Sequence, residues 1–444
     1  MTLFTLFWAS GDLAKLKIFP SLFSLYRHGL LPEDFVLMWY ARSEMTREVF
    51  HTVVRDALVS TGVWVDDEKL ISFLALVDYY QGSYDDIASY EWYLSYVETE
   101  YHYDIRVSRH LVYLSVPPSV APAILDALAS VFHVGESAIR VILEKPFGHD
   151  RESAHLLFEH LYALYPRESL YFLDHYLGKE TIRNLALRDG STFLSRLLSL
   201  EHIESIEISA IETVDAGGRI GYFDSVGTIE DMIQSHLIQM LSFAALDTSN
   251  RPLRERKLDI LESLRFDPKR ENIILGQYSG YRSHDARVAD SDTETYGAIR
   301  MELSIGDVTV PVFFRSGKAL EEKSTYIHIH LKPDIIDAEG CEWVTIDITK
   351  NQVLLHSKTG EQKEISIARS DICNLYHLDA HEVLFLDVMD GDDTFFLSSA
   401  EIELAWWLID SVKETMQKEK LRPYPYVEKS KGPEVAVAFY PWLY

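Results

Sequence analysis

The first third of the chain alternates short apolar runs with segments of helical periodicity. The apolar runs predict strands at Leu3–Phe7, Phe35–Trp39, His110–Val116 and Arg140–Glu144, and one helical pattern covers Pro122–Phe132. Strands that alternate with helices predict a parallel sheet with crossover connections. In such a sheet, ligands bind beyond the carboxyl ends of the strands.

Beyond about residue 195 the periodicity changes to strict alternation of apolar and polar residues. Helical patterns interrupt it at Ile229–Leu246 and Glu401–Lys418. This mixture predicts an α+β domain with a large, mainly antiparallel sheet. The alternating segments are Ser205–Thr213, Ile299–Ile305, Val308–Phe314, Tyr326–Leu331 and Val344–Ile348.

The charge balance restricts the partners of the protein. A net charge of −27 at pH 7 argues against nucleic acid or an anionic membrane as the main partner, so a phosphorylated ligand needs a local basic cluster. The chain shows no apolar run of membrane-spanning length, no export leader and only two cysteines, Cys341 and Cys373. These features predict a protein of the reducing cytoplasm, without a disulfide framework or a metal site.

A candidate cofactor turn follows the first predicted strand. The segment Trp8–Ala14 leads into a helical pattern that carries Lys17, and a turn of this kind can cradle a pyrophosphate at the helix start. Only Gly11 of two expected glycines is present. Arg42, after the second strand, stands where NAD-binding folds have an acid for the ribose 2′-hydroxyl. An arginine suits a 2′-phosphate and favours NADP, while an ordinary surface arginine is the alternative.

The densest group of reactive side chains is the run Asp174–Glu180, with two acids, an imidazole, a phenol and an ammonium around Gly178. Such a group suits a site that holds a small anion and carries out proton chemistry beside it. A solvated turn is the alternative for any isolated run of this kind. Gly178 is expected to keep the turn tight, and no role is predicted for Glu180.

Taken together and in order, eight segments resemble the glucose-6-phosphate dehydrogenase family, and Asp174–Glu180 is the most specific of them. The resemblance implies an α/β Rossmann-type dinucleotide-binding domain over residues 1–172. It implies an α+β substrate-binding and dimerisation domain with a large, mainly antiparallel sheet over residues 173–444. The matching segments are Ala9–Lys15, Tyr40–Ser43, Glu144–Gly148, Asp174–Glu180, Gly221–Asp224, Asp231–His236, Asp292–Tyr296 and Ser316–Leu320.

The resemblance also implies an activity. Members oxidise β-D-glucose 6-phosphate to 6-phospho-D-glucono-1,5-lactone with hydride transfer to NADP, the first step of the oxidative pentose phosphate pathway. A cytoplasmic homodimer or dimer of dimers is implied. In the family pattern His236 is the general base and Asp174 orients it. The residues implied for the substrate are Lys145, His175, Tyr176, Lys179, Glu212, Asp231, Lys318 and Lys323, and those for the cofactor are Ser10, Gly11, Asp12, Lys17, Arg42 and Lys145.

Physical chemistry agrees with these roles. Loss of hydride from C1 requires removal of the hydroxyl proton, and imidazole titrates close to neutrality. On a single α-helix, Asp231 and His236 would lie about 140° apart and both could border a ligand. The lysines of the implied sites supply the basic cluster that the acidic chain requires. A core histidine is the alternative for His236, because apolar residues surround it in the sequence.

Trp8 and Trp39 depart from the family pattern, which has glycine at the first position and usually at the second. A tryptophan at position 8 would obstruct the cofactor, which leads to the hypothesis that the protein binds NADP poorly. The alternative function is then a catalytically impaired relative that binds sugar phosphate or acts in an assembly. A second hypothesis is mistranslation, because some bacterial codes read UGA as glycine and others as tryptophan. The nucleotide sequence of codons 8 and 39 tests this hypothesis, because UGG at both positions would end it.

Overall fold

The computed structural model describes residues 1–7, 13–64, 68–132, 138–188, 192–365 and 376–439. The chain divides into two compact units. Unit 1 consists of Met1–Phe147, Leu156–Gly178 and Asp371–Leu397, and unit 2 of Gly148–His155, Lys179–Ser370 and Ser398–Tyr444. The expected boundary between residues 172 and 173 falls inside the second segment of unit 1 and stays a prediction.

Unit 1 is built on a parallel sheet of six strands in the order β3-β2-β1-β4-β5-β6. The four strands that the sequence predicts are confirmed within a few residues, and β3 and β6 are additional. The strands are β1 (Thr2–Phe7), β2 (Phe35–Ala41), β3 (Val77–Gln81), β4 (Arg109–Leu114), β5 (Ala138–Glu144) and β6 (Leu170–Leu173).

Helices connect these strands, and the first of them starts with a π-helical turn, η1 (Ala14–Ile18). One helix, α14, comes from a part of the chain more than two hundred residues later than the sheet, which the sequence pattern did not indicate. The helices are α1 (Phe19–His28), α2 (Arg47–Ser60), α3 (Glu68–Leu74), α4 (Ile87–Tyr101), α5 (Ala121–Val131), α6 (Arg151–Leu164), whose first residues belong to unit 2, and α14 (Ala380–Asp390).

The central strand β1 shows why the apolar runs of unit 1 are continuous. All six of its residues are buried. The Phe4 ring lies edge-on to Phe385 of α14, with centroids 5.7 Å apart, whereas the Thr5 hydroxyl lies 2.5 Å from the Tyr93 hydroxyl of α4. Successive side chains of a strand point to opposite faces, so α14 and α4 cover opposite faces of the sheet. A strand covered on both sides is therefore largely apolar, and the buried hydroxyl of Thr5 is paired with that of Tyr93.

Unit 2 contains a mixed sheet of ten strands, with β15-β14-β13-β12-β7-β11-β10-β9-β16 in sequence and β8 beside β10. Most neighbours are antiparallel, as predicted, but β7 and β11 are parallel, and so are β9 and β16. The strands are β7 (Ile203–Ile211), β8 (Leu264–Arg265), β9 (Ile273–Tyr278), β10 (Tyr296–Ile305), β11 (Val308–Gly317), β12 (Ser324–Leu331), β13 (Trp343–Asp347), β14 (Gln352–His356), β15 (Gln362–Ile365) and β16 (Tyr424–Tyr426).

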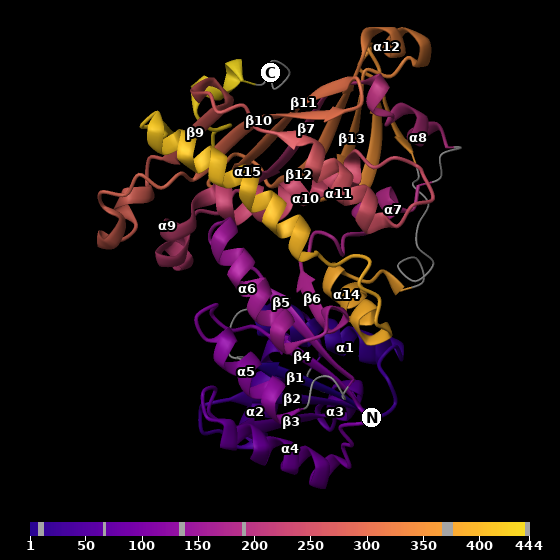
Figure 1. The fold of residues 1–444 in the computed structure, drawn as a ribbon, viewed down its shortest axis with the longest axis vertical. Helices are drawn as coiled ribbons and strands as arrows, with labels where there is room; N and C mark the ends of the chain where they lie inside the picture. Colours follow the sequence, from indigo (N-terminus) through magenta and orange to yellow (C-terminus); the bar gives the residue numbers. More distant parts are fainter. Residues whose placement is uncertain (8–12, 65–67, 133–137, 189–191, 366–375, 440–444) are drawn as a thin grey trace. The chain divides into compact units, whose positions relative to one another are not determined.

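The helices α10, α11 and α15 of unit 2 pack against one another beside the sheet (Figure 1). A buried ion pair joins two of them, because Lys257 Nζ lies 2.5 Å from Glu401 Oε1 and both side chains are at most 1% exposed. The helices of unit 2 are α7 (Glu180–Ala186), α8 (Phe193–Leu197), α9 (Ile220–Thr228), the π-helical η5 (Ile229–Leu237), α10 (Ile238–Ala244), α11 (Leu253–Ser263), α12 (Pro333–Glu339) and α15 (Ser399–Lys418).

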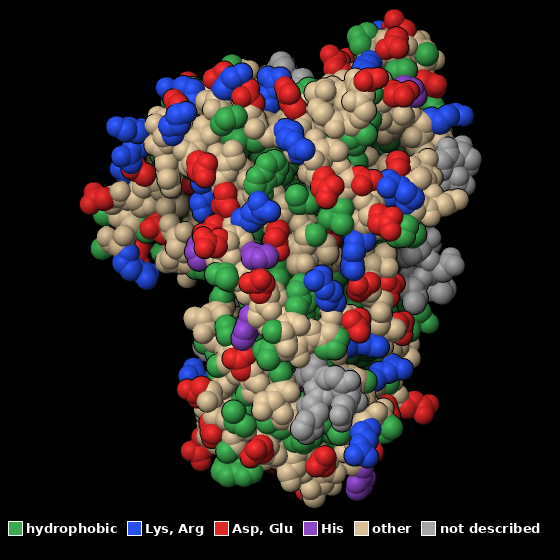
Figure 2. Space-filling view, in the orientation of Figure 1, with side chains coloured by type: hydrophobic (Ala, Val, Ile, Leu, Met, Phe, Trp, Pro, Cys, Tyr) green, Lys and Arg blue, Asp and Glu red, His purple; other side chains and the backbone are tan. Residues whose placement is uncertain are grey.

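The surface mixes both signs of charge despite the excess of acids. Figure 2 shows lysine and arginine side chains interspersed among aspartate and glutamate on the visible face. Among the described residues, no helix combines the length and the apolar character needed to cross a bilayer.

Candidate active site

In unit 1, two predicted segments leave the sheet at the same edge. The strands β5 and β6 are parallel neighbours, with Glu144 opposite Leu173. Lys145 and Asp174 are the next residues of the two strands, so both follow carboxyl ends at this edge. This is the edge at which parallel sheets bind ligands.

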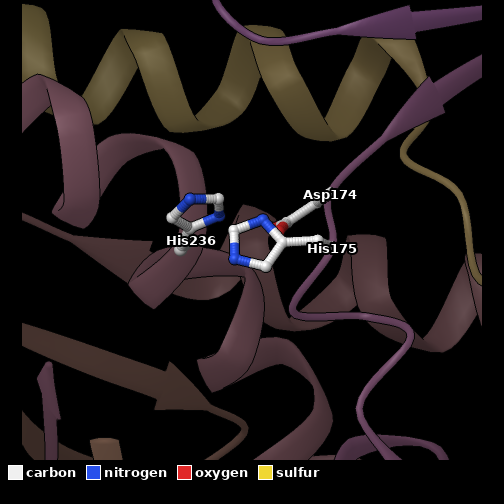
Figure 3. Close-up of side chains that lie close together, drawn as sticks. All are labelled: Asp174, His175 and His236. Carbon is white, nitrogen blue, oxygen red and sulfur yellow. The ribbon is translucent and has the colours of Figure 1, made fainter. Parts of the chain in front are cut away.

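The residues after β6 form a compact turn around Asp174. This aspartate is only 3% exposed, and its Oδ1 accepts the backbone N–H of Tyr176 at 2.9 Å. Its carbonyl accepts the N–H of Leu177 at 3.0 Å. His175 stacks on His381 of α14, with centroids 6.0 Å apart and rings 10° from parallel. Figure 3 shows Asp174 and His175 on this segment.

Gly178 is needed for a reason other than the predicted one. A Cβ atom at this position would lie 2.4 Å from the carbonyl oxygen of Ala380, so the backbone at the start of α14 occupies the space of a side chain. Its φ angle is not in the left-handed region, so turn geometry does not require glycine. The expectation that Gly178 serves the tight turn is therefore corrected to close packing against α14.

Glu180, for which the sequence predicts no role, has a structural one. Its Oε2 accepts the side-chain N–H of Asn351 at 2.5 Å, and the hydroxyl of Thr181 bonds the amide oxygen of the same asparagine. Asn351 has a φ of 55°, in the left-handed region that asparagine tolerates better than most residues. The first turn of α7 therefore fixes the β13–β14 hairpin.

Glu144 is a half-buried acid for which the sequence predicted no role. Desolvation raises its pKa to about 7, while a hydrogen bond from the Tyr113 hydroxyl at 2.5 Å and the charge of Lys145 oppose that rise. The sequence did contain an indication of this acid, because Glu144 ends an apolar strand and directly precedes Lys145. Because Glu144 has a pKa near neutrality and lies beside Lys145, its protonation state affects the charge at this edge of the sheet.

In unit 2, the parallel pair β7 and β11 brings two other predicted residues together. Ile211 lies opposite Gly317, so Glu212 and Lys318 follow adjacent carboxyl ends. Lys318 Nζ lies 2.5 Å from Glu212 Oε2 and 5.2 Å from the ring centroid of Phe223. Both charged side chains are partly exposed, at 14% and 32%, so they can reach a ligand.

Asp231 and His236 lie on η5, and their relation differs from the prediction. The expected α-helix would separate them by about 140°. The segment Ile229–Leu237 is π-helical, and a π-helix bonds residue i to residue i+5, so residues five apart lie about one turn apart on the same side. Asp231 is half-buried and His236 is 2% exposed. Figure 3 shows His236 on this helix.

Glu294 anchors the first turn of η5 and was also missed, although it lies inside the matching segment Asp292–Tyr296. Its Oε1 accepts the N–H of Ile229 at 3.1 Å, and its carbonyl accepts the N–H of Thr228. Gly227, with a φ of 66°, permits the approach, because a Cβ there would lie 2.2 Å from Glu294 Oε1. The carboxyl is 8% exposed, and desolvation raises its pKa to about 7.

A Glu294→Gln variant is expected to change how stability depends on pH. The folded-state pKa of about 7 lies above the ordinary value of 4.5, so protonated Glu294 contributes stability fully below 4.5. That contribution is lost as pH rises through 7 and amounts to about 3 kcal/mol. Glutamine can still accept the N–H of Ile229 but cannot ionise. Urea unfolding at about pH 5 and pH 8 should show a smaller loss of unfolding free energy for this variant.

The control for this prediction is Glu271→Gln, which makes the same replacement of a carboxylate oxygen by an amide NH2 group at an exposed glutamate. Its loss of unfolding free energy between the two pH values should match that of the parental protein. An equal loss in the Glu294→Gln variant would contradict the assignment of a buried, titrating carboxyl.

The other predicted site residues lie on separate elements of the two units. Lys179 is the half-buried N-cap of α7, and Lys323 is exposed directly before β12. Lys17 is exposed on η1 and Arg42 is exposed directly after β2. The predicted cofactor residues Ser10, Gly11 and Asp12, and also Trp8, lie outside the described residues.

Trp39 is part of the core of unit 1. It is 2% exposed, and its ring centroid lies 4.4 Å from that of Phe50 and 5.4 Å from that of Tyr79. Its indole N–H finds no hydrogen-bond acceptor among the described residues. The side chain fills space that a glycine would leave open.

The described residues fit an NADP cofactor. The sheet order places β1 and β2 side by side, with Lys17 on the helix after β1 and Arg42 at the carboxyl end of β2. An exposed guanidinium at this edge supplies the bidentate donors that a 2′-phosphate accepts.

A parallel six-stranded sheet with this strand order is a dinucleotide-binding fold, and the acid and base side chains described above indicate a dinucleotide-dependent oxidoreductase. Residues 5–184 match the family model for the glucose-6-phosphate dehydrogenase NAD binding domain, and residues 185–441 match that for the C-terminal domain. The chain belongs to the glucose-6-phosphate dehydrogenase family. The predictions of family, fold class and oxidoreductase are confirmed, and the predicted reaction with NADP is the activity of this family.

Similar proteins agree with this assignment over nearly the whole chain. Glucose-6-phosphate 1-dehydrogenase of Dictyostelium discoideum is 32% identical, over 96% of this chain and 91% of that protein. The cytoplasmic enzyme 6 of Arabidopsis thaliana is 33% identical, over 96% and 88%. A solved glucose-6-phosphate dehydrogenase in complex with its substrate glucose-6-phosphate superposes with a TM-score of 0.84 at 31% identity, over 99% and 96%.

Proposed function

We propose that this chain oxidises β-D-glucose 6-phosphate at C1, with NADP as hydride acceptor and His236 as the base. The observation that supports it most is the retained set of acid–base and cationic side chains around the carboxyl ends of parallel strands in both units. A buried aspartate, Asp174, belongs to this set, and a buried histidine, His236, lies on η5. A relative that had lost catalysis would have no need of this pair.

In the proposed reaction, His236 takes the proton of the C1 hydroxyl as the C1–H bond breaks. Asp174 accepts the N–H of the second imidazole nitrogen, which fixes the tautomer and stabilises the imidazolium. The bound cofactor supplies the acceptor for the hydride. Lys17 and Arg42 are proposed to hold it, together with Ser10, Gly11, Asp12 and Lys145.

The remaining residues are proposed to hold the sugar phosphate. His175, Tyr176 and Lys179 supply one imidazole, one phenol and one ammonium for the phosphate. Lys145, Glu212, Asp231, Lys318 and Lys323 are proposed to line the sugar. The Glu212–Lys318 pair holds the ammonium in place before the ligand arrives, which reduces the entropy lost on binding.

Purified protein with glucose 6-phosphate and NADP is expected to produce reduced cofactor, followed by its absorbance. Glucose without the phosphate should give a far slower reaction, because the cationic group then has no anion to bind. The alternative is a catalytically impaired relative that only binds sugar phosphate. Folded protein that binds glucose 6-phosphate but forms no reduced cofactor would support that alternative and contradict the proposal.

The assembly and the location of the protein are part of the same proposal. By analogy with the family we propose a homodimer, or a dimer of dimers, in the cytoplasm. Light scattering of the purified protein should give at least twice the chain mass of 51.1 kDa. A mass of one chain would contradict it.

A further inference from the structure

The loop after β3 lies beside the predicted 2′-phosphate residue. The strands β2 and β3 are parallel, with Ala41 opposite Gln81, so Arg42 and the loop 82–85 leave the sheet at the same edge. Arg42 Cζ lies 5.0 Å from the centroid of the Tyr84 ring. The carbonyl of Arg42 accepts the side-chain N–H of Gln81 at 3.4 Å. The guanidinium of Arg42 therefore contacts the loop 82–85, and its backbone carbonyl contacts the last residue of β3.

The Tyr84 ring is a fixed platform for the guanidinium. Tyr84 is 4% exposed, and its ring packs on those of Phe7 and Tyr40, with centroids 6.1 Å and 6.2 Å away. Its carbonyl accepts the hydroxyl of Tyr90 at 3.1 Å. The Tyr40 hydroxyl donates to the carbonyl of Ser83 at 2.8 Å. Because strand and helix residues hold the loop, the ring cannot move away from Arg42 without disturbing the core.

Asp85 brings a negative charge to the same place. Its side chain is exposed, and its Oδ1 accepts the Ser83 hydroxyl at 2.5 Å. That hydrogen bond lowers the pKa of Asp85, with a smaller contribution from the charge of Arg42. Asp85 is therefore ionised at neutral pH, and it directly follows Tyr84, whose ring lies against the Arg42 guanidinium. A phosphate that binds Arg42 meets this second anion.

We propose that Tyr84 and Asp85 set the selectivity for the 2′-phosphate, with Tyr84 positioning Arg42 and Asp85 competing for it. Stacking on an aromatic face orients a guanidinium and leaves its N–H edge directed outward for bidentate binding. The neighbouring carboxylate attracts the same edge and repels the phosphate, so it reduces the preference for NADP over NAD. This inference rests on the proposed use of NADP.

The test is calorimetric titration of the full chain with adenosine 2′,5′-bisphosphate and with 5′-AMP, which differ only in the 2′-phosphate. The parental protein should bind the bisphosphate more tightly. Tyr84→Leu should weaken bisphosphate binding by about 10-fold and leave 5′-AMP binding unchanged, and Tyr84→Phe, which keeps the ring face, should resemble the parental protein. Asp85→Asn should tighten bisphosphate binding by about 3- to 10-fold at low salt.

Each result either supports or overturns the inference. Equal bisphosphate affinity for Tyr84→Leu and the parental protein overturns the positioning role. Unchanged affinity in Asp85→Asn, an exposed position where folding is not at risk, overturns the competing role. If the parental protein does not distinguish the two ligands, the proposed NADP function itself fails. Thermal unfolding of Tyr84→Leu shows whether a loss of both ligands reflects misfolding. In that case the positioning role is judged from the ratio of the two affinities, because a smaller folded fraction lowers both equally and leaves their ratio unchanged.

Discussion

A His236→Asn variant is expected to lose about 10²- to 10⁴-fold in kcat, the usual contribution of a positioned general base. Asparagine keeps a polar side chain of similar reach but cannot take up the proton of the C1 hydroxyl. The KM for glucose 6-phosphate should change little, because the base acts mainly in the transition state. Initial rates of cofactor reduction at saturating NADP measure both quantities.

The pH profile separates catalysis from a structural effect. The parental kcat should fall on the acid side, because an imidazolium cannot accept a proton, and the variant should lose this dependence. His102→Asn is the matched control, since His102 is exposed and its φ of 54° suits asparagine. A His236→Asn enzyme with parental kcat would refute the proposed base. Circular dichroism should show that both variants are folded.

A Trp39→Gly variant is expected to lose about 4–6 kcal/mol of unfolding free energy. Removal of a buried tryptophan side chain costs about 3–5 kcal/mol, and glycine within a strand costs about 0.5–1 kcal/mol more than alanine. The site cannot close easily, because Leu6 and Tyr79 lie beside Trp39 in the sheet and Phe50 packs on it. The loss is comparable to the whole stability of many domains. Urea unfolding measures it.

Trp39→Phe is the control, because it keeps an aromatic ring against Phe50 and also removes the indole N–H that lacks an acceptor among the described residues. The smaller ring and the relieved N–H offset each other, so its stability should stay much closer to the parental value. The comparison also bears on the mistranslation hypothesis. A Trp39→Gly protein as stable as the parental one would favour glycine as the natural residue, and UGG at codons 8 and 39 would end that hypothesis.

The residue pattern alone was enough to predict the fold class and the family, and the roles of the site residues remain proposals. Period-two alternation and continuous apolar runs predicted β1, β2, β4 and β5 and the main strands of unit 2, because burial on one or two faces leaves a direct trace in the residue pattern. The run Asp174–Glu180 identified the family. The family could be identified without a structure, because its pattern consists of particular residue types in a particular order along the chain.

The way those residues are held became visible in the folded chain. Register in parallel sheets aligns Glu212 with Lys318 and Lys145 with Asp174, and sequence distance hides such pairs. The sequence pattern predicted an ordinary α-helix at Asp231 and His236, and the structure shows a π-helix there. Its first turn is capped by Glu294, which lies 65 residues after Ile229 in the chain. The need for glycine at position 178 likewise comes from a distant segment, because the carbonyl of Ala380 in α14 occupies the space of a side chain. Local patterns report burial, whereas these features arise from contacts between distant segments.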